Sequence, residues 1–92
     1  MKIEHQPRDH KGSFVHKVEN ETLAEMTYSK AGNAMIIIDH TEVSEKLRGL
    51  GVGNKLLESL VQYARENSFK VMPLCPFAKS VFEKREDLRD VL

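Results

Sequence analysis

The run Arg48-Gly49-Leu50-Gly51-Val52-Gly53 contains the residue types and spacing best suited to binding an anion. Glycines let a backbone curl tightly, and successive N–H groups at the positive end of a helix dipole bind anionic groups. Apolar residues at helical spacing follow directly, from Val52 to Ala64. The run therefore predicts a phosphate-binding turn, and the plain alternative is a tight strand-to-helix turn without a ligand.

Two common phosphate motifs do not fit this glycine run. No Gly-Lys-Ser/Thr follows it, as a Walker A motif requires. The Rossmann fingerprint also fails, because the glycines stand at every second position and the strand before them ends a meander.

Three segments before the glycine run have the patterns of strands. Polar and apolar side chains alternate over Phe14–Glu19 and Ala24–Ser29, with a reversal after each, so the chain should begin as an antiparallel meander. Ala34–Ile38 is continuously apolar, which predicts a central strand covered on both faces, and this strand continues with polar residues to Val43.

The segments after the glycine run predict a helix, a strand and a second helix. The first helix should end near Asn67, and Phe69–Leu74 should form a short strand in which Pro73 limits pairing to one side. Pro76 should start the last helix, followed by a charged run that faces water. Strand, helix and strand make a parallel βαβ unit, so the expected fold is α+β or α/β in one domain, residues 1–92.

The glycine run resembles the acyl-coenzyme A signature of the GNAT superfamily, Arg/Gln-x-x-Gly-x-Gly/Ala between a long strand and an amphipathic helix. Arg48, Gly51 and Gly53 occupy its three fixed positions. The resemblance extends from about Phe14 to the C-terminus, and Asp39–Val43 together with Pro73–Phe77 are similar to the short, single-domain GNAT-like subgroup. It implies an abbreviated GNAT fold without most of the segments that build the acceptor pocket.

The resemblance also implies the cofactor and the residues that hold it. Acetyl-CoA or coenzyme A would place its pyrophosphate on the backbone N–H groups of Arg48, Gly49, Leu50, Gly51, Val52, Gly53 and Asn54. Its pantetheine arm would pair with Thr41, Glu42 and Val43 as an added strand would. A valine at Gly51 or Gly53 should abolish cofactor binding and leave a folded domain.

Three functions remain open from the sequence. The first is an acetyl-CoA-dependent N-acetyltransferase that acts on a primary amine of a small molecule or a protein. The alternative is a coenzyme A binding module with little or no catalytic activity, and the third is a phosphate-loop protein unrelated to coenzyme A.

Catalysis would need groups that accept the amine proton and protonate the departing thiolate. The family usually takes the second proton from a tyrosine in the final helix, where this chain has Phe77 and Phe82. Cys75 precedes that helix, whose dipole favours a thiolate, so it is a candidate acid or transient acyl acceptor, or else a small core residue. His40 and Glu42 are candidates for deprotonating the amine, although a hydrogen-bonded structural role also suits His40.

Composition argues against several other classes of protein. Fourteen basic residues balance fourteen acidic ones and are scattered, so no nucleic-acid partner is expected. The longest apolar run, Ala34–Ile38, is too short for a membrane span, and Met1–His10 does not resemble a signal peptide, so a cytoplasmic location is expected. The expected oligomeric state is a monomer or a weak homodimer. One cysteine permits no internal disulfide, and His5 and His10 should be solvated imidazoles, so no metal is expected.

Overall fold

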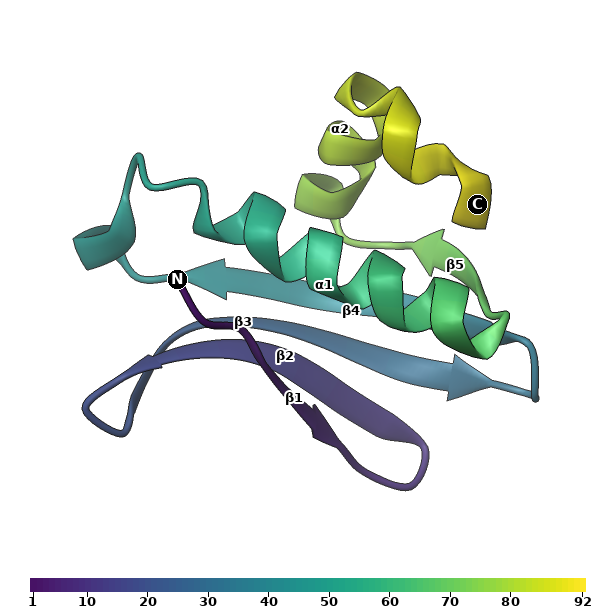
Figure 1. The fold of residues 1–92 in the computed structure, drawn as a ribbon, viewed down its shortest axis with the longest axis horizontal. Coiled ribbons are helices and arrows are strands. Elements are labelled where there is room, and N and C mark those ends of the chain that lie inside the picture. The colour runs from purple at the N-terminus through teal and green to yellow at the C-terminus, as the bar shows by residue number, and fades with distance from the viewer.

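In a computed structural model that describes residues 1–92, five strands form one sheet in the order β1-β2-β3-β4-β5 (Figure 1). One long helix lies along the sheet, and a shorter helix follows the last strand. In chain order the elements are β1 (Glu4–Pro7), β2 (Lys11–Val18), β3 (Glu21–Ala31), β4 (Met35–Val43), the 3₁₀ turn η1 (Glu45–Leu47), α1 (Val52–Asn67), β5 (Lys70–Pro73), α2 (Pro76–Lys84) and the 3₁₀ segment η2 (Glu86–Val91).

The pairing of the strands confirms the predicted meander and βαβ unit. Strands β1 to β4 pair antiparallel in sequence order, and β5 pairs parallel with β4 after the crossover through α1. The turn between β2 and β3 holds Glu19 and Asn20 at positive φ, and Gly32, with φ of 68°, forms the next reversal. The sequence therefore predicted the fold class correctly.

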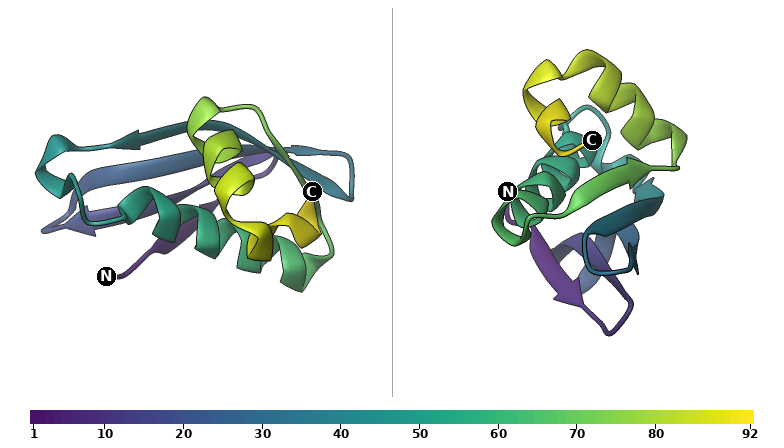
Figure 2. Two further views of the ribbon diagram at one scale, coloured as in Figure 1. Left: turned by 90° about the horizontal axis from the view of Figure 1, so that it is seen from above. Right: turned by 90° about the vertical axis from the view of Figure 1, so that its right-hand side faces the viewer.

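The hydrophobic core lies on one face of the sheet. Both helices cover this face (Figure 2), and Ala24, Met26 and Tyr28 of β3 point into the same core as the apolar side chains of α1 and α2. The expectation of a central strand buried on both faces is wrong for β4. It stands fourth of the five strands, and its side chains alternate between fully buried Ile36 and half-exposed Ile37, because no helix covers the second face.

Residues 4–7 form β1, an edge strand that the sequence did not predict. His5 explains its docking: its ring stacks on Phe14 with centroids 4.3 Å apart, and its Nε2 lies 2.6 Å from the Tyr28 hydroxyl. The prediction of a solvated imidazole is therefore wrong for His5, whereas His10 is exposed. Burial, together with the charge of Lys30, lowers the pKa of His5.

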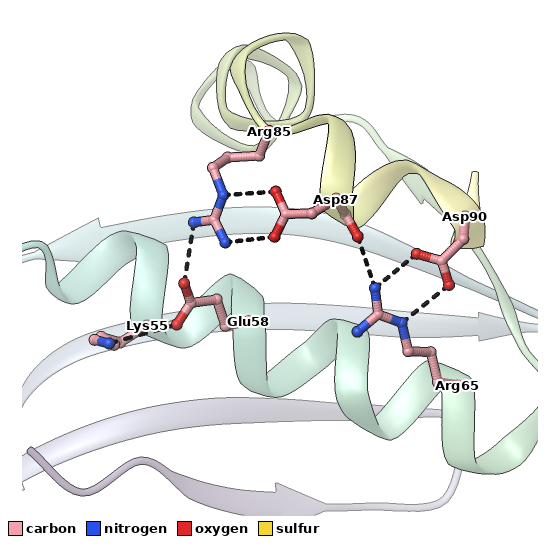
Figure 3. A network of polar contacts seen from close by, with 6 residues as sticks. All are labelled: Lys55, Glu58, Arg65, Arg85, Asp87 and Asp90. Atoms are coloured by element: carbon pink, nitrogen blue, oxygen red, sulfur yellow. Dashed lines mark hydrogen bonds and ion pairs between the residues drawn. The ribbon is translucent and has the colours of Figure 1, made fainter.

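The charged segment after α2 is only partly in water, which corrects the expectation that it faces solvent throughout. Leu88 and Val91 of η2 are each 4% exposed and complete the core. Ion pairs join the segment to α1 (Figure 3). These include Arg85 with Glu58 at 3.0 Å and Arg65 with Asp90 at 2.6 Å.

The hydrogen bond from Arg65 lowers the pKa of the Asp90 carboxyl group. These pairs are exposed or only partly buried and are individually weak, but together they hold α2 and η2 against α1. None of the helices has both the length and the apolar composition that a membrane span requires.

Candidate functional site

The turn between β4 and α1 contains the glycine run, and two of its glycines are required by the backbone. Ser44 caps η1, and the chain then passes through exposed Arg48 into the turn. Gly49 and Gly51 have φ of 80° and 70°, a left-handed conformation that costs a residue with a Cβ about 1–2 kcal/mol. A Cβ at either position would meet no atom within 4 Å.

At Gly53 a glycine is required by packing and not by the backbone conformation, because this residue lies inside the first turn of α1 and is buried. A Cβ there would collide with Cζ of Phe77 on α2, so this glycine lets the two helices approach closely. A valine at Gly53 would therefore also disturb the packing of α1 against α2, and that this variant leaves a folded domain stays a prediction. The backbone or the packing of the protein itself requires each of the three glycines, so their number alone does not indicate a ligand.

The N-terminus of α1 has the property that an anion site needs. Its N-cap, Gly51, provides no side-chain hydrogen bond, and no acidic residue lies in the first turn. The N–H of Lys55 makes the first backbone bond, to the Gly51 carbonyl at 3.2 Å. The N–H groups of Val52, Gly53 and Asn54 precede this bond and have no partner within the helix. They can donate to an anion at the positive end of the helix dipole.

Strands β4 and β5 part halfway along β4. Their pairing runs only from Met35 with Lys70 to Ile38 with Pro73, and the N–H of Leu74 makes the last bond, to the Ile38 carbonyl at 3.1 Å. Pro73 cannot donate from its nitrogen, so it helps to end the pairing. The second half of β4, which includes predicted Thr41, Glu42 and Val43, therefore has a free backbone edge on the β5 side.

Cys75 lies where the two strands part, at the N-cap of α2. Its Sγ accepts a hydrogen bond from the Ala78 N–H at 3.3 Å and lies 3.2 Å from Oγ1 of Thr41. The residue is 5% exposed and belongs to the hydrophobic core. Its position thus suits both the functional and the packing interpretation, and Thr41 is the polar group that it touches on β4.

A bulge in β4 decides which face its polar side chains occupy. The register shifts between Thr27 and Tyr28 of β3, and beyond the shift Thr41 pairs with core-facing Met26. His40 instead pairs with Thr27 on the open face. His40 is exposed and without a side-chain hydrogen bond, so the structural role considered for it is not observed. The structure separates His40 from Thr41 on the two faces of one strand.

A cavity of about 450 Å³ opens on the uncovered face of the sheet beside His40. It extends across β2, β3 and β4 to the turn between β1 and β2. Its polar lining includes Arg8, Lys11, Ser13, Glu25, Asp39 and His40.

Sequence reasoning singled out only His40 among these polar lining residues. The others come from separate strands and from the β1–β2 turn. No local signal could have grouped them. One carboxylate in the lining is fixed in place, because the Ser29 hydroxyl donates to Oδ2 of Asp39 at 2.6 Å.

The protein has two tyrosines, and neither lies in the final helix. Tyr28 of β3 is fully buried in the hydrophobic core, and burial raises the pKa of its hydroxyl group. Tyr63 belongs to α1 and packs its ring against Phe69. No group of three or more His, Cys, Asp or Glu side chains is placed to hold a metal ion.

Comparisons with known proteins agree with this architecture. The family model of GCN5-related N-acetyl-transferases matches residues 13–91. A GCN5-like protein from Staphylococcus aureus, solved by NMR, shares 44% identity over 96% of this chain and 85% of its own, with a TM-score of 0.73. No curated protein matches the sequence at a significant level.

More distant solved structures share the fold. The ribosomal-protein-S18-alanine N-acetyltransferase from Escherichia coli has a TM-score of 0.70 at 13% identity, and the match covers 85% of this chain and 53% of that enzyme. A GNAT family acetyltransferase from Elizabethkingia anophelis with acetyl-CoA bound has a TM-score of 0.64 at 16% identity, covering 82% of this chain and 52% of that chain. This chain thus spans about half the length of these two proteins.

Proposed function

Because the chain belongs to the GCN5-related N-acetyltransferase family, we propose that it binds acetyl-CoA and transfers the acetyl group to a primary amine. One observation carries the proposal: the uncapped N-terminus of α1 stands beside the free edge of β4. The relative from Elizabethkingia anophelis has acetyl-CoA bound on the same fold, which supports the choice of cofactor.

The residues present fit a coenzyme A molecule at both features. The pyrophosphate would accept hydrogen bonds from the N–H groups of Val52, Gly53 and Asn54, within the predicted segment Arg48–Asn54. The positive charge of Arg48 would add a partly screened attraction. The pantetheine arm would pair with the free backbone edge at Thr41–Val43, where β5 no longer does.

Acetyl transfer forms a C–N bond between the amine and the acetyl carbon and breaks the C–S bond of the thioester that acetyl-CoA supplies. The amine must lose a proton, and His40 and Glu42 are the proposed bases on the open face. The departing thiolate must gain a proton, and the Cys75 thiol, held against Thr41, is the proposed donor. The transient acylation of Cys75 is the second role open to this thiol.

A second candidate function is coenzyme A binding with little or no catalysis. The absence of a tyrosine from α2 favours it, because the family usually protonates the thiolate from that position. Two further expectations from the sequence stay predictions: the cytoplasmic location, and the monomeric or weakly dimeric state.

Calorimetric titration with coenzyme A and acetyl-CoA tests the binding step. A matched pair of variants tests its location: Gly51→Val and Gly32→Val both place a side chain at positive φ, near 70°, in open space. Both should lose similar stability, but only Gly51→Val should lose coenzyme A affinity. Gly32 lies in the β3–β4 turn, at the opposite end of the sheet from the α1 N-terminus (Figure 1).

Chromatographic measurement of coenzyme A release from acetyl-CoA, with and without amines, then separates the candidates. Amine-dependent release supports the transferase, and tight binding without release supports the binding module. If neither ligand binds at millimolar concentration, both candidates fail. Nucleotide binding in that case would indicate the unrelated phosphate-loop protein.

A further inference from the structure

The open face of the sheet holds a cavity that the proposed cofactor position leaves free. The cofactor would lie at the α1 N-terminus and along the free edge of β4, whereas the cavity of about 450 Å³ extends over β2, β3 and β4. Both helices cover the opposite face (Figure 2). His40 and Leu74 line the cavity at the point where β4 and β5 part. An acceptor in the cavity could therefore reach the acetyl group from the open face.

The charges of the lining are balanced in number and unevenly distributed along the cavity. Arg8 and Lys11 lie at one end, joined through the Arg8 N–H and the Lys11 carbonyl at 2.8 Å. Lys11 pairs in register with Ser29, four residues along β3 from Glu25, which is about 13 Å in a strand. The Lys11 end of the lining thus has two cations and one carboxylate, because Asp39 accepts a hydrogen bond from Ser29. The other end has the carboxylate of Glu25.

None of these charged groups has an ion-pair partner within the protein. Arg8, Lys11, Glu25 and Asp39 take part in no ion pair, although other acidic and basic side chains of the molecule do. Like charges add to the imbalance at the acidic end, because Glu25 stands directly opposite Glu42 across β3 and β4, an arrangement that destabilises a sheet. A ligand cation at Glu25 would relieve it.

One hydroxyl group of the lining is also available to a ligand. Ser13, in the middle of the lining, is only 8% exposed and is the one polar residue among the buried side chains. Its hydroxyl group makes no hydrogen bond within the protein, and the oxygen reaches the cavity, because no buried side-chain polar atom of the protein lacks a partner. In register it lies in one row with Thr27 and His40, between the two charged ends.

We propose that this cavity holds the acceptor and selects a small primary amine that carries an anionic group at its other end. The inference rests on the proposed function and names its substrate class. The amino group lies toward Glu25 and His40, and the carboxylate or phosphonate-type anion lies toward Arg8 and Lys11. A polyamine fits less well, because its second cation would face the Arg8 and Lys11 charges.

Acetyl transfer to amines of matched length tests the selection. Ethylamine, butylamine and hexylamine are compared with glycine, 4-aminobutyrate and 6-aminohexanoate, with 1,4-diaminobutane as the dication and 3-aminopropylphosphonate as the second anion. The zwitterionic amines should have the higher kcat/KM at one or more chain lengths. Comparison of the carboxylates with the phosphonate then shows which anion the cavity prefers. Faster transfer to the simple amines, the diamine or a lysine-containing peptide would overturn the proposal.

Two variants that each remove one positive charge test where the preference for zwitterionic amines arises. Arg8→Ala should lower the ratio of kcat/KM for the preferred zwitterion to that for the matched simple amine by about tenfold, as for the loss of one partly screened contact. Lys84→Ala, at the exposed end of α2, should leave the ratio unchanged. Equal ratios in Arg8→Ala and the parent protein would overturn the assignment of the anionic end.

NMR measurements test whether the cavity binds the zwitterionic amines, and they do not require catalysis. In the protein with bound coenzyme A, the zwitterionic amines should shift the amide signals of Ser13 and Thr27, whereas butylamine and 1,4-diaminobutane should not. Coenzyme A binding without these shifts would refute the acceptor pocket alone. A failure of coenzyme A itself to bind would refute the proposed function, and titration of the free protein would still show whether the cavity takes the zwitterion.

Discussion

Replacing Gly53 by alanine should destabilise the protein through its contact with Phe77. The added methyl group would meet the end of the Phe77 ring, and overpacking of this kind costs typically about 1–3 kcal/mol. Alanine regains about 1 kcal/mol because it is a better helix former than glycine. The net loss should be about 1 kcal/mol, which lowers Tm by roughly 4–8 °C in a domain of this size.

A double-mutant cycle followed by thermal and urea unfolding measures this contact. Phe77→Leu removes the ring atoms that the methyl group would meet but leaves the gain in helix propensity, so the double variant should be more stable than the sum of the single effects by about 2 kcal/mol. Gly51→Ala is the matched comparison. Its cost, about 1–2 kcal/mol, comes from its positive φ and should be the same with either residue at position 77. A coupling near zero for Gly53, or an equal coupling for Gly51, would refute the assignment of separate reasons to the two glycines.

Three further outcomes are expected. Arg48→Ala should weaken coenzyme A binding by about tenfold in calorimetry, as for one partly screened charge, and unchanged affinity would remove Arg48 from the site. Cys75→Ala and Cys75→Ser should keep most of the coenzyme A affinity but lose acetyl transfer, and activity retained per folded molecule would make Cys75 a core residue. The lowered pKa of His5 means that the unfolded chain binds its proton more readily, so the stability contributed by the neutral ring is present above about pH 6.5 and falls as pH decreases through and below that value. Unfolding across pH should show a smaller decrease in His5→Gln, and an identical decrease would contradict the role of the ring.

The sequence by itself determined the order and type of most elements, because these depend on local patterns. Alternation predicts β2 and β3, and helical spacing from Val52 predicts α1. The glycine run indicated the turn before α1, where Gly49 and Gly51 have positive φ. The parallel crossover followed from the handedness and length of a strand-helix-strand unit. The family resemblance then placed the cofactor on that turn, and the match to residues 13–91 confirms the family.

The tertiary structure alone decided what each of these residues touches. Gly53 belongs to the same motif as Gly51, but a glycine is required there because the position packs against Phe77, 24 residues further along the chain. β1 was missed because its docking depends on His5 reaching Phe14 and Tyr28 on other strands. One bulge places His40 on the open face and Thr41 on the core face, and the same open face gathers Arg8, Ser13 and Glu25 into a cavity. Such groupings depend on register and on which face the helices cover, and these are set by contacts between distant segments that no local pattern records.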